Sequence, residues 1–284
     1  MPYRLIALDL DGTLLTSRHE ITPRTREALR AARERGIVAT VATGRSPHSA
    51  RLISRDIGGG PIICCNGAAV YDEAGNPVSI KPIPQAPLLR CLEVCIEAGL
   101  LLECYTELGN YMDRPVAHML AYKRWFLPRL SWARGLQALA RIWRRNHVKP
   151  VRNLLKWAEQ PDHPKVLKVM VVGEAANLGQ AAARLGREVP GLSLTSSGRE
   201  NIEVMAAGVN KGHGLQMLAA RLKIPREALI AFGDSDNDLE MLTYAGTGVA
   251  MGNANDAAKA AAARVTGTNN EDGVAAAIEE MCLS

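Results

Sequence analysis

The sequence predicts an α/β fold in which a doubly wound parallel sheet carries a second, inserted α/β domain. Short, continuously apolar runs alternate with helical patterns at both ends of the chain, which is typical of a parallel sheet covered by helices on both faces. The length of 284 residues suits about two domains. A break in composition in the middle of the chain, where the charge becomes strongly basic, indicates where the second domain lies.

The N-terminal part contains three predicted strands with helices between them. The strands are the apolar runs 5–8, 37–42 and 61–65. Thr22 and Pro23 supply an N-cap and a first-turn proline for the first helix, and Gly36 ends it. Ser46 begins the second helix. The pattern therefore predicts a strand–helix–strand–helix–strand unit.

A hairpin over residues 70–80, with Gly75-Asn76 at its turn, is predicted to close this first part. The C-terminal part then returns to the same alternation. It contains a strand at 229–232, a helix at 239–244, a strand at 248–251 and two further alternations. Both parts are therefore expected to contribute to one sheet.

The predicted core comprises residues 1–83 and 198–284, and residues 84–197 form the predicted insertion. The insertion has its own alternation of a helix at 85–98, strands at 100–105 and 166–172, and a helix at 181–188. Pro82-Ile83-Pro84 has the composition of a linker.

Composition excludes several classes of protein. The apolar share is 47% and the charged share 22%, enough apolar residues for a core that needs no disulfide or metal to fold. No apolar run is long enough to span a membrane, and the N-terminus turns acidic at Asp9, too early for a signal peptide. We therefore expect a cytoplasmic protein without membrane contact. The six cysteines show no zinc spacing and are expected to be reduced and mostly buried.

Four polar clusters follow apolar runs or open helices. They are Asp9-Leu10-Asp11-Gly12-Thr13, Thr43-Gly44-Arg45, Lys211-Gly212 and Gly233-Asp234-Ser235-Asp236-Asn237-Asp238. In an open parallel sheet the carboxyl ends of the strands meet at one edge, where ligands bind. Acids gathered beside a lysine, a threonine hydroxyl and helix N-termini suit a divalent cation together with a phosphate. Because several acids alone would repel one another, Mg²⁺ is the expected ion.

Taken singly, each cluster also has a plain structural interpretation. A carboxylate pair after a strand is more often a turn or a helix cap than a catalytic pair. The series Asp234, Asp236, Asp238 resembles the start of a calcium loop, but Leu239 and Ala245 stand where that loop needs glycine and glutamate. No known nucleotide-binding glycine motif is present. Only the combination and order of the clusters indicate a function.

In that order the clusters resemble the motifs of the haloacid dehalogenase (HAD) superfamily, specifically its Cof-type phosphatases. Asp9 to Leu15 resembles the first motif, Thr43-Gly44-Arg45 the second, Asn210-Lys211-Gly212 the third and Gly233 to Asp238 the fourth. The resemblance implies a Rossmann-like core with a cap domain at residues 84–197.

The resemblance also implies a role for each motif residue. Asp9 would be the nucleophile that forms an aspartyl phosphate, and Asp11 the general acid and then base. Thr43, Gly44, Lys211 and Asn237 would bind the phosphate, and Asp238 would position its neighbours from behind. Asp9, the backbone carbonyl of Asp11, and Asp234 would bind Mg²⁺.

These roles imply a Mg²⁺-dependent phosphatase of small phosphorylated metabolites, either sugar phosphates or monophosphates of cofactors or flavin precursors. No nucleic-acid or membrane partner is expected, and the oligomeric state stays open. Two alternatives also stay open. A hexose phosphomutase shares the Asp9–Asp11 pair, and a catalytically idle protein would bind an anionic partner through its basic cap.

The basic segment of the cap, residues 114–168, matches no motif. It holds 13 Lys and Arg against 2 acids, and all four tryptophans. Helical spacing places Trp132, Leu136, Leu139 and Trp143 on one face and Arg134, Arg141 and Arg145 on the other. We expect the apolar face to pack on the cap core. A membrane-surface or partner helix, and a nucleic-acid contact, are the alternatives.

Overall fold

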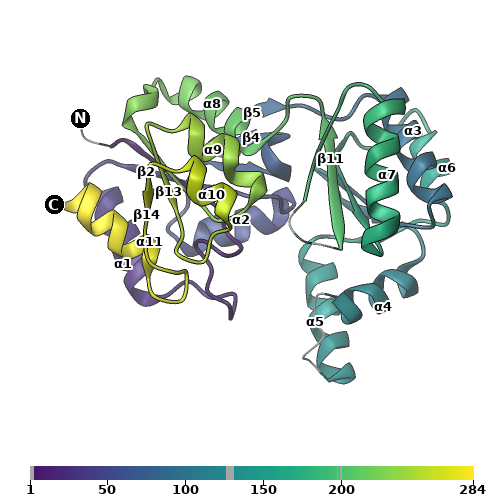
Figure 1. The fold of residues 1–284 in the computed structure, drawn as a ribbon, viewed down its shortest axis with the longest axis horizontal. Coiled ribbons are helices and arrows are strands. Elements are labelled where there is room, and N and C mark those ends of the chain that lie inside the picture. The colour runs from purple at the N-terminus through teal and green to yellow at the C-terminus, as the bar shows by residue number, and fades with distance from the viewer. Residues whose placement is uncertain (1–2, 126–130, 197, 199) are drawn as a thin grey trace. The chain divides into compact units, whose positions relative to one another are not determined.

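The chain divides into two compact units. A computed structural model describes residues 3–125, 131–196, 198 and 200–284, and of Arg145 it describes the backbone alone. The first unit comprises Met1–Ile80 and Val209–Ser284, and the second comprises Lys81–Gly208. Figure 1 shows how each unit surrounds a sheet of its own with helices. The predicted α/β class is confirmed.

The sheet of the first unit has eight strands. Their spatial order is β14 (Arg264–Val265), β13 (Thr247–Ala250), β12 (Leu229–Gly233), β1 (Leu5–Leu8), β2 (Val38–Ala42), β3 (Ile62–Cys64), β4 (Ala69–Tyr71) and β5 (Pro77–Ile80). From β14 to β3 all neighbours are parallel, and β4 and β5 add an antiparallel hairpin. The sequence pattern predicted a parallel sheet here, because β1, β3 and β12 are apolar and buried along their whole length.

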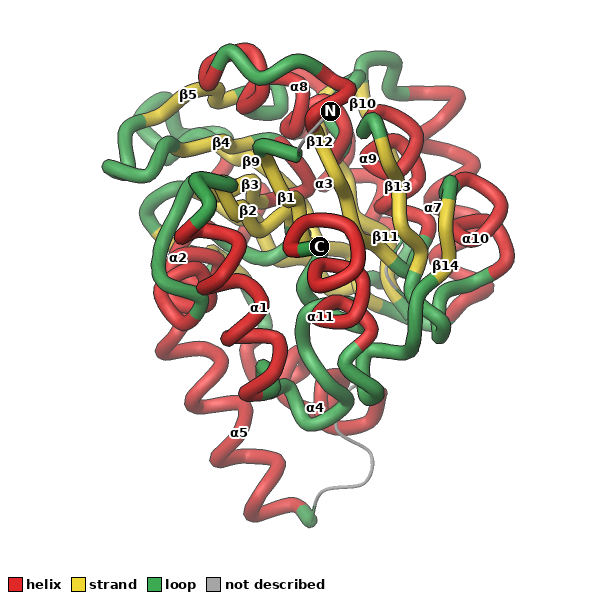
Figure 2. Tube along the Cα trace, turned by 90° about the vertical axis from the view of Figure 1, so that its left-hand side faces the viewer, coloured by secondary structure: helices red, strands yellow, loops and turns green. Residues whose placement is uncertain are grey.

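Helices cover both faces of this sheet, as Figure 2 shows. One face carries α1 (Pro23–Glu34), α2 (Pro47–Asp56) and α11 (Gly273–Ile278). The other carries α8 (Lys211–Leu222) and α9 (Leu239–Tyr244), and α9 contacts α10 (Asp256–Ala261). Leu5 and Ala7 of β1 pack in the core formed with α8 and α9. The alternating residues Ile6 and Leu8, also fully buried, point to the opposite face.

The second unit is built on a six-stranded sheet that is mostly antiparallel. Its order is β10 (Leu192–Thr195), β11 (Asn201–Ala206), β9 (Val166–Val172), β6 (Leu101–Thr106), β7 (Gly109–Met112) and β8 (Lys149–Pro150). One face packs in an apolar core with α3 (Gln85–Glu97), α6 (Leu154–Ala158) and α7 (Ala175–Glu188). Two further helices, α4 (Pro115–Trp125) and α5 (Trp132–Arg145), contact each other.

The second unit reaches further along the chain than the sequence pattern predicted. The expected core began again at residue 198, yet β11 lies in the sheet of the second unit. β11 pairs antiparallel with β9 and β10, and Ile202 and Val204 enter the apolar core of that unit. The prediction was therefore wrong for residues 198–208, because the local sequence of β11 does not reveal which of the two sheets it joins.

The apolar face predicted for residues 132–143 is only partly covered. Leu139 is buried, but Trp132 is 58% exposed and Leu136 41% exposed, so the prediction was wrong for these two residues. The contact lies at Gly135 instead, where a Cβ atom would come within 2.7 Å of the Lys123 side chain. The missing side chain lets Lys123 of α4 approach at Gly135, and the Lys123 ammonium group lies over the Trp132 ring at 5.3 Å from its centroid. The predicted position of the Arg145 side chain lies outside the described residues.

Five of the six cysteines are buried, as expected, and Cys282 is partly exposed. Among the described residues, no helix is both long and apolar enough to cross a membrane.

The N-cap of α1 also joins the two parts of the first unit. Thr22 Oγ1 accepts a hydrogen bond from the backbone N–H of Thr25 at 3.1 Å and donates one to Asp272 Oδ1, just before α11. We expect Thr22→Ala to lower the free energy of unfolding by about 1–2 kcal/mol in urea titrations, because the cap and the link are lost together. Thr22→Ser keeps the hydroxyl and should lose much less. Equal losses in both variants would contradict this explanation.

Candidate active site

Three of the predicted clusters follow neighbouring parallel strands at the same edge of the sheet. Asp9 follows β1, Thr43 follows β2 and Asp234 follows β12. β1 lies between β2 and β12 and is parallel to both, so the three clusters leave the sheet side by side. This is the edge where open α/β sheets bind ligands.

Lys211 links the nucleophile candidate to the fourth cluster. It is the first residue of α8, whose N-cap Asn210 accepts a hydrogen bond from His213 N–H at 2.7 Å. Lys211 Nζ is fully buried and donates to Asp9 Oδ1 at 2.6 Å and to Asp238 Oδ1 at 2.7 Å. Burial opposes its charge, but the attraction of Asp238 and Asp9 outweighs burial and raises the pKa of Lys211 above its ordinary value. The site therefore holds a permanent buried cation.

Three carboxylates gather around this lysine. Oxygens of Asp9, Asp234 and Asp238 lie within 4.8 Å of one another. Burial, only partly offset by Lys211, raises the pKa of Asp9 well above its ordinary value, and the charges of Asp238 and Asp234 add to the rise. Burial and the charge of Asp238 likewise raise the pKa of Asp234 to about 6. At this separation each pair of charges repels by about 3 kcal/mol at an effective dielectric constant of about 20, so one lysine does not balance three acids.

A divalent cation would fit this cluster. Asp9 Oδ2 is buried and has no hydrogen-bond partner among the described residues. Asp234 Oδ1 accepts a hydrogen bond from Thr13 Oγ1 at 2.9 Å, which fixes the carboxylate toward the first cluster. Both oxygens of Asp238 already accept hydrogen bonds, Oδ1 from Lys211 and Oδ2 from the backbone N–H groups of Asp234 and Ser235. Asp9 and Asp234 therefore have the oxygens that a hard cation such as Mg²⁺ prefers, whereas Asp238 orients the lysine and the loop.

Gly12 allows Asp234 to approach the first cluster. Its φ is +91°, a conformation that favours glycine, and a Cβ atom there would lie 2.4 Å from Asp234 Oδ2. Any side chain at residue 12 would displace the carboxylate. The glycine of this motif is therefore required by the position of Asp234 as well as by the turn.

Asp11 is held by an arginine that the sequence analysis quoted only as part of a motif. Arg45 binds it through two hydrogen bonds, Nε to Oδ2 at 2.8 Å and Nη2 to Oδ1. Desolvation opposes the charge of Asp11, but the hydrogen bonds and charge of Arg45 outweigh it and lower the pKa of Asp11. His19 Nδ1 lies 3.8 Å from the same carboxylate. In this arrangement Asp11 is ionised and its side chain is half exposed.

The remaining predicted residues lie beside these groups. Thr43 is buried, and its Oγ1 accepts the backbone N–H of Arg45 at 3.1 Å, which leaves the hydroxyl proton for another acceptor. Gly44 lies between them in the same turn. Asn237 is nearly buried, and its side chain contacts Ser235 Oγ at 2.9 Å and Asn66 Oδ1 at 3.5 Å.

Hydrogen bonds thus join Asp9, Lys211, Asp234 and Asp238 into one network, and a second set joins Asp11 to Thr43 through Arg45. Sequence reasoning assigned no role to Arg45, Thr13 or Asn66. Arg45 could have been found, because it comes directly after Thr43-Gly44 at the edge where Asp11 was expected. Thr13 and Asn66 carried no signal of their own beyond their motifs.

Comparison with known proteins agrees with the motifs. Residues 6–278 match the model of the haloacid dehalogenase-like hydrolases. The chain is 32% identical over 281 residues to pyridoxal phosphate phosphatase YbhA of Escherichia coli (strain K12), covering 97% of each chain. It is 31% identical over 284 residues to 5-amino-6-(5-phospho-D-ribitylamino)uracil phosphatase YitU of Bacillus subtilis (strain 168), covering 98% of this chain and 97% of that protein.

A solved structure shows the same fold. The structure of a haloacid dehalogenase-like hydrolase from B. subtilis superimposes with a TM-score of 0.86 at 30% identity, covering 98% of this chain and 99% of the other. The likeness in sequence and fold extends over both units. The chain therefore belongs to the haloacid dehalogenase-like hydrolases and is a phosphoric monoester hydrolase of their Cof type.

Proposed function

We propose that this phosphatase is Mg²⁺-dependent, acts on small phosphorylated metabolites and forms an aspartyl phosphate on Asp9. The observation that carries the proposal is the buried Lys211, which binds one oxygen of Asp9 while the other oxygen has no hydrogen-bond partner among the described residues. A carboxylate held in this way has a fixed direction and one oxygen free for a cation. Its neighbour Lys211 can neutralise the charge that an arriving phosphate brings.

In the first step, Asp9 Oδ1 attacks the phosphorus and the bond from phosphorus to the alcohol oxygen breaks. Lys211 Nζ and the Thr43 hydroxyl donate hydrogen bonds to the phosphoryl oxygens, which carry most of the charge in the transition state. Gly44 and Asn237 complete the phosphate contacts. Asp238 keeps Lys211 pointed at Asp9 through its 2.7 Å hydrogen bond.

Asp11 moves the protons. It donates a proton to the leaving alcohol, then removes one from the water that hydrolyses the aspartyl phosphate, which regenerates Asp9 and releases inorganic phosphate. Its bond to Arg45 keeps Asp11 ionised at rest, so Arg45 must release it before the first step. The negative phosphate competes for the same guanidinium group, and substrate binding thereby frees Asp11 to take up a proton.

Asp9, Asp234 and the backbone carbonyl of Asp11 would hold Mg²⁺. When bound, the ion screens the phosphate from the carboxylates and stabilises charge on the phosphoryl group. Carboxylate crowding and the unpartnered Asp9 Oδ2 support this assignment.

The substrate is a small metabolite such as a sugar phosphate, a cofactor monophosphate or a phosphorylated flavin precursor. Two relatives named above act on pyridoxal phosphate and on a phosphorylated ribitylaminouracil, and both align over nearly the whole chain. The inserted unit, residues 81–208, serves as the cap that selects the leaving group. It is inserted in the chain between the second and third clusters, and the first unit alone carries the residues proposed for phosphoryl transfer, which supports this role.

Phosphate release from p-nitrophenyl phosphate and a panel of metabolite phosphates tests the proposal. Release should require Mg²⁺, stop with chelator and fall at least about a thousandfold in Asp9→Asn, because the nucleophile is lost. Asp236→Asn, an acid of the fourth cluster outside the network, is the matched control and should stay active. Turnover that persists in Asp9→Asn would contradict the mechanism, and conversion between hexose phosphates without phosphate release would indicate a mutase.

Metal binding should depend on pH through Asp234. Its pKa of about 6 lies above the value of about 3.9 in an unfolded chain, so its ionisation between these pH values costs the metal-free protein stability. We expect the Tm without metal to fall as pH rises through this window. Because Mg²⁺ binds the ionised form, it should raise the Tm more at pH 7.5 than at pH 5. Asp234→Asn should lose most of this stabilisation, and an equal Mg²⁺ effect at both pH values would refute the assignment.

The pH profile should report the bond between Arg45 and Asp11. Removing the guanidinium in Arg45→Gln lets the pKa of Asp11 rise in the free enzyme, so the pH profile of kcat/KM, which reports the free enzyme, should move to higher pH. Arg45→Lys keeps the charge and should shift the profile less. A lower rate with an unmoved profile in Arg45→Gln would show that Arg45 binds substrate without controlling Asp11.

A further inference from the structure

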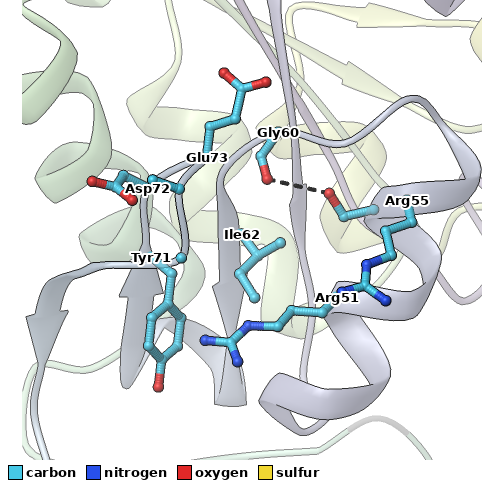
Figure 3. A pocket seen from close by; sticks show the side chains of 10 residues that line it. Arg51, Arg55, Gly60, Ile62, Tyr71, Asp72 and Glu73 are labelled. Atoms are coloured by element: carbon cyan, nitrogen blue, oxygen red, sulfur yellow. Dashed lines mark hydrogen bonds between the residues drawn. The ribbon is translucent and has the colours of Figure 1, made fainter.

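A second polar groove lies in the first unit, away from the carboxylate cluster. Its volume is about 320 Å³, with α2 on one side and the β3–β4 strands and their following turn on the other. Figure 3 shows Arg51 and Arg55 reaching into it from α2. Ile62, the first residue of β3, lies in the floor of the groove. The site around Asp9 lies at the opposite edge of the sheet, where the parallel strands end. The groove is therefore separate from the site around Asp9.

The two arginines lack acidic partners. They are one turn apart on α2, both are exposed, and no described carboxylate forms an ion pair with either. By contrast, the helical residues Arg30 and Arg184 each pair with two glutamates. Two like charges at this spacing repel each other, and a bound anion would remove the repulsion.

The acids in the wall of the groove are occupied elsewhere. Asp72 accepts hydrogen bonds from Asn76 and lies 3.9 Å from Arg221, and Glu73 lies 3.8 Å from Arg33. In Figure 3 both carboxylates point away from the two guanidinium groups. The positive charge of Arg51 and Arg55 is therefore the uncompensated charge of the groove.

The floor gives the groove an apolar side. Tyr71 and Ile62 are buried, and the Arg51 guanidinium lies over the Tyr71 ring at 4.6 Å from its centroid. A contact of this kind with a ring face holds a guanidinium group in place, and the N–H groups that such a group carries can bind the oxygens of an anion. Ser54 Oγ is tied to the Gly60 carbonyl at 3.3 Å and closes the far side, as the dashed line in Figure 3 shows.

We infer that this groove is a second binding site for a phosphoryl group, held by Arg51 and Arg55 with Tyr71 and Ile62 beneath it. Paired guanidinium groups match the geometry of a phosphoryl dianion. The phosphoryl group is either free phosphate or that of a small phosphorylated metabolite whose organic part lies on the apolar floor. Binding here needs none of the catalytic residues.

Nuclear magnetic resonance of the arginine Nε–Hε groups in the full chain tests this site. Inorganic phosphate and adenosine 5′-monophosphate are added separately in the presence of chelator, which prevents turnover. The Arg51 and Arg55 signals, assigned with Arg51→Lys and Arg55→Lys, should shift together and saturate. The Arg45 signal reports binding at the catalytic edge independently. Sodium chloride at the same ionic strength should not reproduce the shifts.

The double variant Arg51→Gln/Arg55→Gln should weaken this binding by at least about tenfold in titration calorimetry, with its phosphatase activity unchanged. Arg26→Gln/Arg30→Gln removes the same charge from a pair on α1 whose arginines already have partners, and it should bind like the wild type. Saturation by both probes identifies a metabolite site, and saturation by phosphate alone a phosphate site. Signals that stay fixed, or move equally with chloride, would overturn the inference, whatever the activity of the enzyme.

Discussion

The buried ammonium group of Lys211 is the interaction on which the rest of the site depends. It joins Asp9 and Asp238, which come from loops after β1 and β12, and its own position comes from the first turn of α8. A buried charge is costly unless it is paired and hydrogen-bonded. Lys211 meets this condition only when three separate segments reach the same edge of the sheet. The charge thus makes the site dependent on correct folding of the whole first unit.

The carboxylates around Lys211 explain why this network favours a further cation. Lys211 binds two of the carboxylates, Asp9 and Asp238. The third, Asp234, is oriented by a hydrogen bond from Thr13, and it fits there because Gly12 has no side chain. The raised pKa values of Asp9 and Asp234 express the same excess of negative charge. In a protein that only bound anions, these acids would weaken binding, because carboxylates repel a negatively charged ligand. Their retention is consistent with the phosphatase family to which the chain belongs.

Arg45 introduces a constraint that the motif resemblance did not contain. A general acid must carry a proton when substrate is bound, whereas the bidentate bond to Arg45 lowers the pKa of Asp11. Both statements hold if the bond breaks when phosphate arrives, because the guanidinium group then has a stronger partner. The resting enzyme would therefore keep its acid inactive until substrate is present.

The sequence by itself determined the α/β class, most of the strands and helices, and the residues of the hydrogen-bond network around Lys211. Apolar strands between amphipathic helices are specified by local pattern, and motif residues at strand ends meet because parallel strands end at one edge. The helix at 239–244, for example, was predicted from the local pattern with the bounds that the structure shows. The start of the helix after Ser46, which caps it, was predicted in the same way.

Only the tertiary structure decided the features that depend on partners distant in the chain. β11 begins with alternating polar and apolar residues, a pattern that does not identify its partner strand, and its pairing with β9 placed it in the second unit. Trp132 and Leu136 remained exposed, although helical spacing placed them on the same face as the buried Leu139. Arg45 acquired a role because its guanidinium group reached Asp11, 34 residues away in sequence. Local pattern fixes which face of an element is apolar or charged, but the partner that covers this face is fixed by packing between segments that the pattern does not relate.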